Sequence, residues 1–196
     1  MKILFIFIVL IIIYKLNRKE NLMGGLPNNK EYNRAKKIGQ TFINNYIEKY
    51  NLPKKGAVMF DIDDTLLYVN RFDLIPIKQI IDLLNYCINR GLLIIIITAR
   101  DSVYRKQTIQ DLNDNFINYS FLYLRKNGDD RIDTFKSKVK RELYENNGIE
   151  ILMSVGDNDI DILGAYSGFG IKLPNKDNPR LYCTSPDGKR LIEIEV

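Results

Sequence analysis

Three aspartates lie within one short stretch of the sequence, VMFDIDDTLL at residues 58–67. Asp61, Asp63 and Asp64 directly follow an apolar run, and Thr65 comes next. Carboxylates this close together repel one another and resist ionisation unless a positive charge lies among them. The stretch therefore predicts a site that binds a cation.

Two more polar clusters follow apolar runs later in the chain, TARD at residues 98–101 and GDNDID at residues 156–161. If the three runs are parallel strands, their carboxyl ends meet at one edge of a sheet, which is where open α/β folds bind ligands. Mg²⁺ prefers a few carboxylates, several waters and the oxygens of a bound phosphate. The clusters therefore predict a magnesium site at that edge.

An EF-hand loop, which binds Ca²⁺, is a rival explanation for part of this pattern. The spacing of Asp157, Asp159 and Asp161 matches its first three ligands. The rest of the loop does not fit, because Ile162 stands where it needs a glycine and Gly168 stands where it needs a glutamate. An EF-hand is therefore excluded.

Positive side chains are needed beside these carboxylates and a bound phosphate. The segment FKSK supplies Lys136 and Lys138 near the start of a predicted helix, and either lysine could point into the site. Arg100 and Asp101, in the second polar cluster, either contact a substrate or pair with other charges on the surface. The sequence leaves these alternatives open.

The elements that must position these residues alternate along the chain. Short apolar runs predict strands at residues 57–60, 92–97, 121–124, 150–155 and 170–173. Apolar periodicity predicts helices at residues 76–90, 102–115, 134–146 and 159–165. Strands that are apolar on both faces and alternate with helices predict a central parallel sheet in a three-layer α/β/α fold. Residues 181–184 and 191–196 predict a C-terminal β-hairpin.

The N-terminal part of the chain differs from the rest. Residues 3–14 form an unbroken apolar run after Lys2, with basic residues behind it. The run is shorter than the roughly 17 to 25 residues of a membrane span, which favours a signal peptide, whereas no cleavage site follows, which favours an uncleaved anchor. We expect residues 1–22 to be a signal or membrane-anchor segment that directs the protein to a membrane or the secretory pathway.

Residues 23–55 connect this segment to the main domain, which we place at residues 56–196. The connection begins with a linker rich in Gly, Pro and Asn. Residues 28–50 then show helical periodicity and end before Pro53, so we expect an amphipathic helix that packs on the domain.

Composition excludes several kinds of site. The chain has no histidine, which rules out histidine-based phosphoryl transfer, a Ser-His-Asp triad and histidine-ligated zinc. Its two cysteines, Cys87 and Cys183, fit neither a disulfide framework nor a thiolate metal site. The formal charge of +5 is compatible with polyanionic partners, but no dense basic block appears, and a solvated basic surface explains it equally.

Taken in order, DIDDT, a hydrophobic run ending in TAR, FKSK and GDNDID resemble the four motifs of the haloacid dehalogenase-like (HAD) superfamily of phosphatases and phosphotransferases. The last two motifs, with LRKNGDDR before them and GIKLPN after, are similar to subfamily IIIB, which includes class B bacterial acid phosphatases and plant vegetative storage proteins. The resemblance covers roughly residues 56–175 and implies the Rossmann-like HAD fold.

The resemblance implies two roles for the first motif. Asp61 would be the nucleophile that attacks phosphorus and forms an aspartyl-phosphate, with its second oxygen on Mg²⁺. Asp63 would protonate the leaving oxygen and then deprotonate the attacking water, and its backbone carbonyl would bind the metal.

The other motifs would supply the phosphate and metal contacts. Thr98 and Ala99 would bind the phosphoryl oxygens together with Lys136, which would also neutralise the charge of the nucleophile. Asp157 would complete the metal shell, and Asp161 would bind the metal or support its ligands.

We therefore predict a Mg²⁺-dependent phosphomonoesterase of the acid phosphatase type that acts on a phosphorylated small molecule or a nucleotide. The motifs are too closely spaced for a large cap domain, so we expect an open site. One alternative is removal of terminal phosphates from a polynucleotide, which the basic charge and the open site favour. Another is a storage or binding protein that keeps the fold without catalysis.

Overall fold

The computed structural model describes residues 26, 29–70, 73–126, 131–186 and 190–191. The predicted signal or anchor segment at residues 1–22 lies outside this part of the chain and stays a prediction. Within the described residues, no helix is both long enough and apolar enough to cross a membrane.

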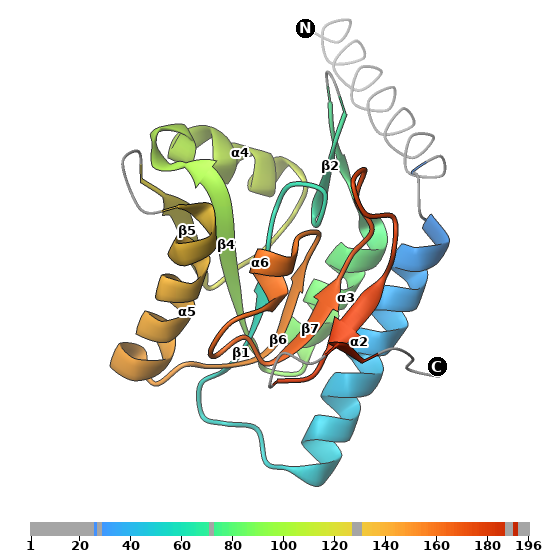
Figure 1. Cartoon of the computed structure of the whole chain (residues 1–196), viewed down its shortest axis with the longest axis vertical. Helices are drawn as coiled ribbons and strands as arrows, with labels where there is room; N and C mark the ends of the chain where they lie inside the picture. The colour runs from blue at the N-terminus through green and yellow to red at the C-terminus, as the bar shows by residue number, and fades with distance from the viewer. Residues whose placement is uncertain (1–25, 27–28, 71–72, 127–130, 187–189, 192–196) are drawn as a thin grey trace, which may run out of the picture.

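A seven-stranded sheet lies at the centre of the molecule, in the order β5-β4-β1-β6-β7-β8-β9 (Figure 1). The parallel strands are β1 (Gly56–Phe60), β4 (Leu93–Asp101), β5 (Phe121–Arg125), β6 (Glu150–Gly156) and β7 (Phe169–Lys172). Two antiparallel strands, β8 (Tyr182–Thr184) and β9 (Arg190–Leu191), extend one edge. The predicted parallel sheet and C-terminal hairpin are confirmed, although residues 192–196 of the hairpin lie outside the described residues.

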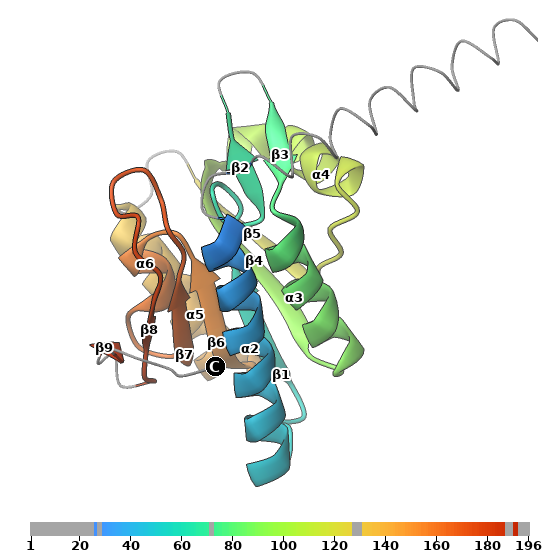
Figure 2. The same cartoon turned by 90° about the vertical axis from the view of Figure 1, so that its right-hand side faces the viewer.

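Helices cover both faces of the sheet, which gives three layers (Figure 2). The helices are α2 (Asn29–Lys49), α3 (Lys78–Asn89), the 3₁₀ turn η1 (Ser102–Tyr104), α4 (Arg105–Asp114), α5 (Ile132–Asn147) and α6 (Asp159–Ile162). Buried side chains of α2, α3 and α4 pack on one face, whereas α5 and α6 lie on the other. The predicted α/β/α arrangement is therefore confirmed.

The central strand β1 is buried on both faces. Val58 and Phe60 belong to the core beneath α2 and α3, whereas Ala57 and Met59 belong to the core beneath α5. A strand that is buried on both sides needs apolar residues at every position rather than at alternate positions. This requirement explains why β1 shows in the sequence as an unbroken apolar run.

Helix α2 packs into the same core as the sheet. Its buried residues recur at steps of three and four, which places them on one helix face; they are Tyr32, Ala35, Ile38, Gly39 and Ile43. At Gly39 the helix lies so close to α3 that an added Cβ would come within 2.7 Å of the Leu83 side chain. The amphipathic helix predicted at residues 28–50 therefore forms and packs on the domain as expected.

The segment between β1 and α3 contains two strands that were not predicted from the sequence. It forms a two-stranded antiparallel hairpin of β2 (Leu67–Val69) and β3 (Leu74–Pro76). Each strand has three residues, which is too few to show the alternation that marks a strand in sequence. The insertion after β1 is thus a small hairpin above the end of the sheet rather than a cap domain (Figure 1).

Candidate functional site

The carboxyl ends of β1, β4 and β6 bring the predicted site residues to one edge of the sheet. Strand β1 lies between β4 and β6 and pairs with both in parallel, so the three strands end side by side. Asp61 directly follows β1, and Asp157 directly follows β6. Asp161 lies in α6, the single helical turn after β6.

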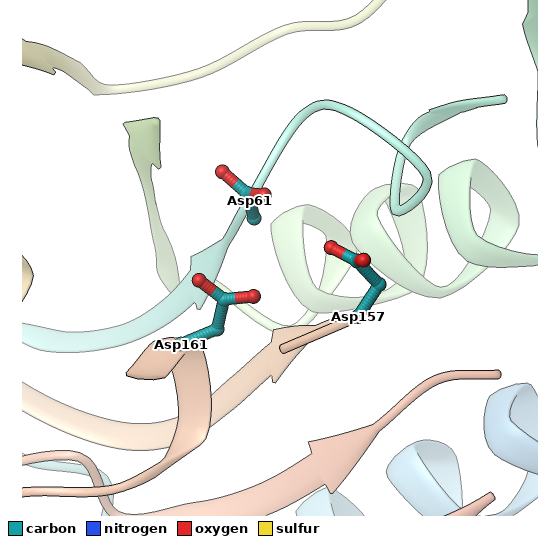
Figure 3. A group of neighbouring side chains, drawn as sticks. All are labelled: Asp61, Asp157 and Asp161. Carbon is teal, nitrogen blue, oxygen red and sulfur yellow. The ribbon is translucent and has the colours of Figure 1, made fainter. Parts of the chain in front are cut away.

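Asp61, Asp157 and Asp161 form one buried cluster (Figure 3). One carboxylate oxygen from each residue lies within 4.8 Å of the others. Three carboxylate oxygens at this separation are a donor set that hard divalent cations prefer. The residues therefore fit a divalent metal site.

Lys136 lies inside this cluster, whereas Lys138 lies outside it. The Lys136 ammonium is 2.9 Å from Asp61 Oδ1 and donates a hydrogen bond to Asp161 Oδ1. Its side chain is only 2% exposed. Lys138 is exposed, two residues further along α5. Of the two lysines that the sequence left open, the structure places Lys136 beside the carboxylates.

Burial governs the ionisation of the cluster. It raises the pKa of Asp61 to about 8, although the positive charge of Lys136 opposes the shift. It also raises the pKa of Asp157 to about 6, against a hydrogen bond from Asn175. Burial disfavours the Lys136 ammonium, but Asp61 and Asp161 outweigh this effect and raise its pKa. Without a metal ion, the cluster therefore retains protons that a bound cation would displace.

Asp161 is fixed by close packing on the end of β6. The backbone N–H of Asn158 donates to Asp161 Oδ2 at 2.9 Å. A Cβ added to Gly156 would lie 2.2 Å from the Asp161 Cβ, so any larger residue would collide with the aspartate. The glycine at the start of GDNDID thus makes room for the third carboxylate.

Asp63 does not join the cluster through its side chain. Its side chain is 38% exposed, and its carboxylate accepts hydrogen bonds from Arg100 Nε at 2.9 Å and from Arg100 Nη2 at 2.6 Å. Arg100 also pairs with Asp111 at 2.7 Å. In this structure, Arg100 therefore forms ion pairs within the protein, which is one of the two alternatives that the sequence left open. Asp101 instead caps η1 by accepting from the Val103 N–H.

Thr98 and Ala99 lie near the end of β4. Thr98 is 1% exposed, and its hydroxyl oxygen accepts from the Arg100 N–H at 3.2 Å. The pairing of β4 with β5 becomes irregular between Thr98 and Asp101. Phe60 pairs with Ile96, so Asp61 is level with Ile97 on the neighbouring strand. Thr98 lies one position further along β4.

Two residues at the site were not singled out from the sequence. Asn175, shortly after β7, donates to the backbone carbonyl of Asp157 at 2.6 Å and to its carboxylate at 3.1 Å. The sequence could have indicated Asn175, because it follows the apolar run at residues 170–173 as the other site residues follow theirs. Lys140 is fully buried behind Asp161. The sequence could have indicated it, because Lys140 lies four residues after Lys136 and residues four apart share a helix face.

Comparison with known families gives one match. A profile described as HAD superfamily, subfamily IIIB (Acid phosphatase) matches residues 68–179, which is more than half of the chain. Thr98, Lys136, Asp157 and Asp161 lie within the match, whereas Asp61 precedes it. Among curated protein sequences, none matches the chain.

Comparison with solved structures shows the same fold in class C acid phosphatase. The class C acid phosphatase from Bacillus anthracis aligns with a TM-score of 0.54 and 21% identity over 69% of this chain. The alignment spans 65% of that protein, so this chain covers slightly less than two thirds of its length. The structure of class C acid phosphatase from the same organism with tungstate bound aligns with a TM-score of 0.53 and 19% identity. That alignment covers 74% of this chain and 72% of the other protein. A chain of a Pnkp1/Rnl/Hen1 complex aligns with a TM-score of 0.48 and 22% identity. That alignment covers 57% of this chain and 42% of the matched chain.

Proposed function

The chain belongs to subfamily IIIB of the HAD superfamily, the acid phosphatase subfamily, and on this premise we propose that it is a Mg²⁺-dependent phosphomonoesterase that forms an aspartyl-phosphate. The observation that carries the proposal is the buried cluster of Asp61, Asp157 and Asp161 with Lys136 among its carboxylates. We propose a phosphorylated small molecule or a nucleotide as the substrate.

The metal would be held by the carboxylates of Asp61, Asp157 and Asp161 and by the backbone carbonyl of Asp63. When bound, it would offset the negative charge of the phosphoryl group and of the attacking carboxylate. Lys136 is already placed to share this task, because its ammonium contacts both Asp61 and Asp161.

In the first step, a carboxylate oxygen of Asp61 attacks phosphorus, and the bond from phosphorus to the leaving oxygen breaks. The leaving oxygen takes a proton from Asp63. Thr98 and Ala99, at the end of the neighbouring strand, would bind the phosphoryl oxygens. Lys136 stabilises the charge that develops on the transferred group.

In the second step, Asp63 accepts a proton from water as the water oxygen attacks phosphorus. The bond between phosphorus and Asp61 breaks, which releases phosphate and restores the carboxylate. Because Arg100 binds the Asp63 carboxylate in this structure, both proton transfers require the Asp63 side chain to rotate away from Arg100.

Hydrolysis of p-nitrophenyl phosphate by the full chain tests this proposal, with Mg²⁺ and with EDTA. We expect turnover that needs the metal and is abolished in Asp61→Asn. The matched control is Asp159→Asn, which removes a nearby carboxylate from outside the cluster and should retain activity. Acid quenching during turnover should trap phosphate on the wild-type protein and not on Asp61→Asn.

Full activity of Asp61→Asn would overturn the proposed mechanism. An absence of metal-dependent phosphate release from p-nitrophenyl phosphate, nucleotides and phosphorylated oligonucleotide ends would instead support the predicted non-catalytic role. Release from oligonucleotide ends alone would support the predicted polynucleotide end phosphatase. The predicted membrane or secretory location is a separate question, because residues 1–22 carry it.

A further inference from the structure

Helix α5 carries a second buried lysine next to the carboxylate cluster. Lys140 lies four residues after Lys136 and has no exposed surface. Side chains four residues apart lie on the same helix face. Helix α5 thus directs two buried lysines toward α6, and the reaction proposed above uses only Lys136.

Within the described part of the chain, the Lys140 ammonium donates its hydrogen bonds to the segment that carries Asp161. Its ammonium donates to the backbone carbonyl of Asp161, to the Leu163 carbonyl at 3.3 Å and to Ser167 Oγ at 2.9 Å. An ammonium group has three protons and no acceptor, so these three oxygens satisfy it completely. Ser167 Oγ in turn donates to the Leu163 carbonyl at 2.7 Å.

Helix α6 needs such support because it consists of four residues, Asp159–Ile162. The last carbonyls of a helix have no partner within the helix, and a single turn is not stable alone. The backbone is already extended at Leu163. Buried carbonyls without partners would be costly. Lys140 supplies a donor to the Asp161 carbonyl, and it adds a second donor to the Leu163 carbonyl beside Ser167 Oγ.

Asp161 is therefore held at both ends by the same helix. Lys136 binds its carboxylate, and Lys140 binds its backbone carbonyl. The close packing of Asp161 against Gly156 leaves little space for the aspartate to shift without leaving the cluster.

We infer that Lys140 is a positioning residue that fixes the backbone of Asp161, and thereby sets the affinity of the carboxylate cluster for a divalent cation. Lys140 contacts neither substrate nor metal in this role. The inference rests on the proposed function, because it requires a cation to bind at Asp61, Asp157 and Asp161.

The sign of the effect separates positioning from simple charge. Lys140 is a cation close to a cation site, so removing its charge alone should strengthen metal binding by relieving repulsion. Removing a residue that positions a ligand should weaken metal binding, typically by about 10- to 100-fold. The two explanations therefore predict opposite changes.

The experiment measures Mn²⁺ binding to the full chain by electron paramagnetic resonance, without substrate. We expect Lys140→Met to raise the dissociation constant for Mn²⁺ by about 10-fold or more. Lys138→Met is the matched control, because it removes the same charge from an exposed position on the same helix and should change the constant less than about twofold. Ser167→Ala removes one of the three partners and should give a smaller increase, about two- to fivefold.

Circular dichroism and thermal unfolding establish that each variant is folded. A folded Lys140→Met with unchanged or stronger Mn²⁺ binding would overturn the inference, even if its melting temperature falls, because a merely structural lysine would affect stability alone. If Lys140→Met does not fold, Ser167→Ala decides, since an unchanged constant there overturns the inference as well. A wild-type chain that binds no Mn²⁺ would instead contradict the proposed function.

Discussion

The two sides of the candidate site are held together in different ways. On the side of α5 and α6, Lys136 and Asp161 are 2% and 0% exposed and form a buried ion pair. On the side of β1 and β4, Arg100 and Asp63 are 15% and 38% exposed and pair near the surface. Losing one partner of a buried pair costs about 3–5 kcal/mol, whereas exposed pairs contribute about 0–1 kcal/mol.

The difference agrees with what the proposed reaction asks of each side. The groups that hold charge in place, Lys136 and Asp161, are rigidly enclosed. Asp63, which must exchange protons with a leaving group and with water, is held by an ion pair that costs little to break. The enclosed part of the site is therefore built on α5 and α6, and the more exposed part on the segments after β1 and β4.

Substitution of Lys136 should have the largest effect. Lys136→Met leaves Asp61 and Asp161 without their ammonium partner and removes positive charge where the transferred phosphoryl group develops negative charge. We expect kcat to fall by about 10²- to 10³-fold. Steady-state hydrolysis of p-nitrophenyl phosphate measures it. Lys138→Met, beside it on α5, should stay within about twofold of wild type, and an equal loss in both variants would contradict the comparison.

Substitution of Asp161 should have the next largest effect. Asp161→Asn keeps the shape of the side chain and removes its charge, so the cluster loses one anionic ligand while the packing against Gly156 survives. We expect the dissociation constant for Mn²⁺ to rise by about 10- to 100-fold. Asp159→Asn should leave the constant unchanged, because the Asp159 carboxylate contacts the Tyr182 hydroxyl and not the cluster.

The stability of the metal-free protein should fall as the pH rises from about 4 to 7. In the unfolded chain, Asp61 and Asp157 release their protons as the pH rises above a pKa of 3.8. In the folded protein their pKa values are raised, so both residues keep their protons to higher pH. The stability gained from these protons is complete below pH 3.8 and is lost as the pH passes about 6 for Asp157 and about 8 for Asp61.

Thermal unfolding in EDTA measures this slope, and we expect a decrease of about 3–6 kcal/mol over the range. Saturating Mg²⁺ should remove or reverse it, because the cation takes the place of the protons. A metal-free protein that becomes steadily more stable from pH 4 to 7 would show that the cluster is not protonated as described. Above pH 7, Lys140 contributes with the opposite sign, because burial lowers its pKa to about 7.

Substitution of Arg100 should have the smallest effect on stability. Arg100→Gln removes the ion pairs with Asp63 and Asp111, which are partly buried, and we expect the free energy of unfolding to fall by about 1–2 kcal/mol, between the values for exposed and buried pairs. Urea denaturation measures it. A loss of about 3–5 kcal/mol, the value for a buried pair, would show that the two sides are not different. A selective increase in KM would show that Arg100 also contacts substrate, the second alternative in the sequence.

Much of the fold was predictable because parallel strands buried on both faces leave a strong pattern. The runs that become β1, β4 and β6 end in polar residues, and this pattern alone predicts that Asp61, Thr98 and Asp157 lie at one edge of the sheet. Strands β2 and β3 were missed because three residues carry no readable period. The hairpin depends on pairing between the two strands rather than on either alone.

The sequence could not predict which of Lys136 and Lys138 lies at the site. Phe135, Val139 and Leu143 mark the stripe of α5 that packs on the sheet, and the two lysines flank this stripe on opposite sides. Which flank meets Asp61 depends on how the helix is docked, and periodicity does not determine docking. The pairing of Asp63 with Arg100 was hidden for a similar reason, since it depends on side-chain rotamers.

Gly156 has a consequence for how this protein can vary. The position contributes no charged or polar side-chain atom, yet every other amino acid adds a Cβ where Asp161 already lies. Its tolerance to mutation should therefore equal that of the aspartates rather than that of an ordinary strand-end residue. In a saturation library selected for phosphatase activity, we expect only glycine codons to persist at position 156.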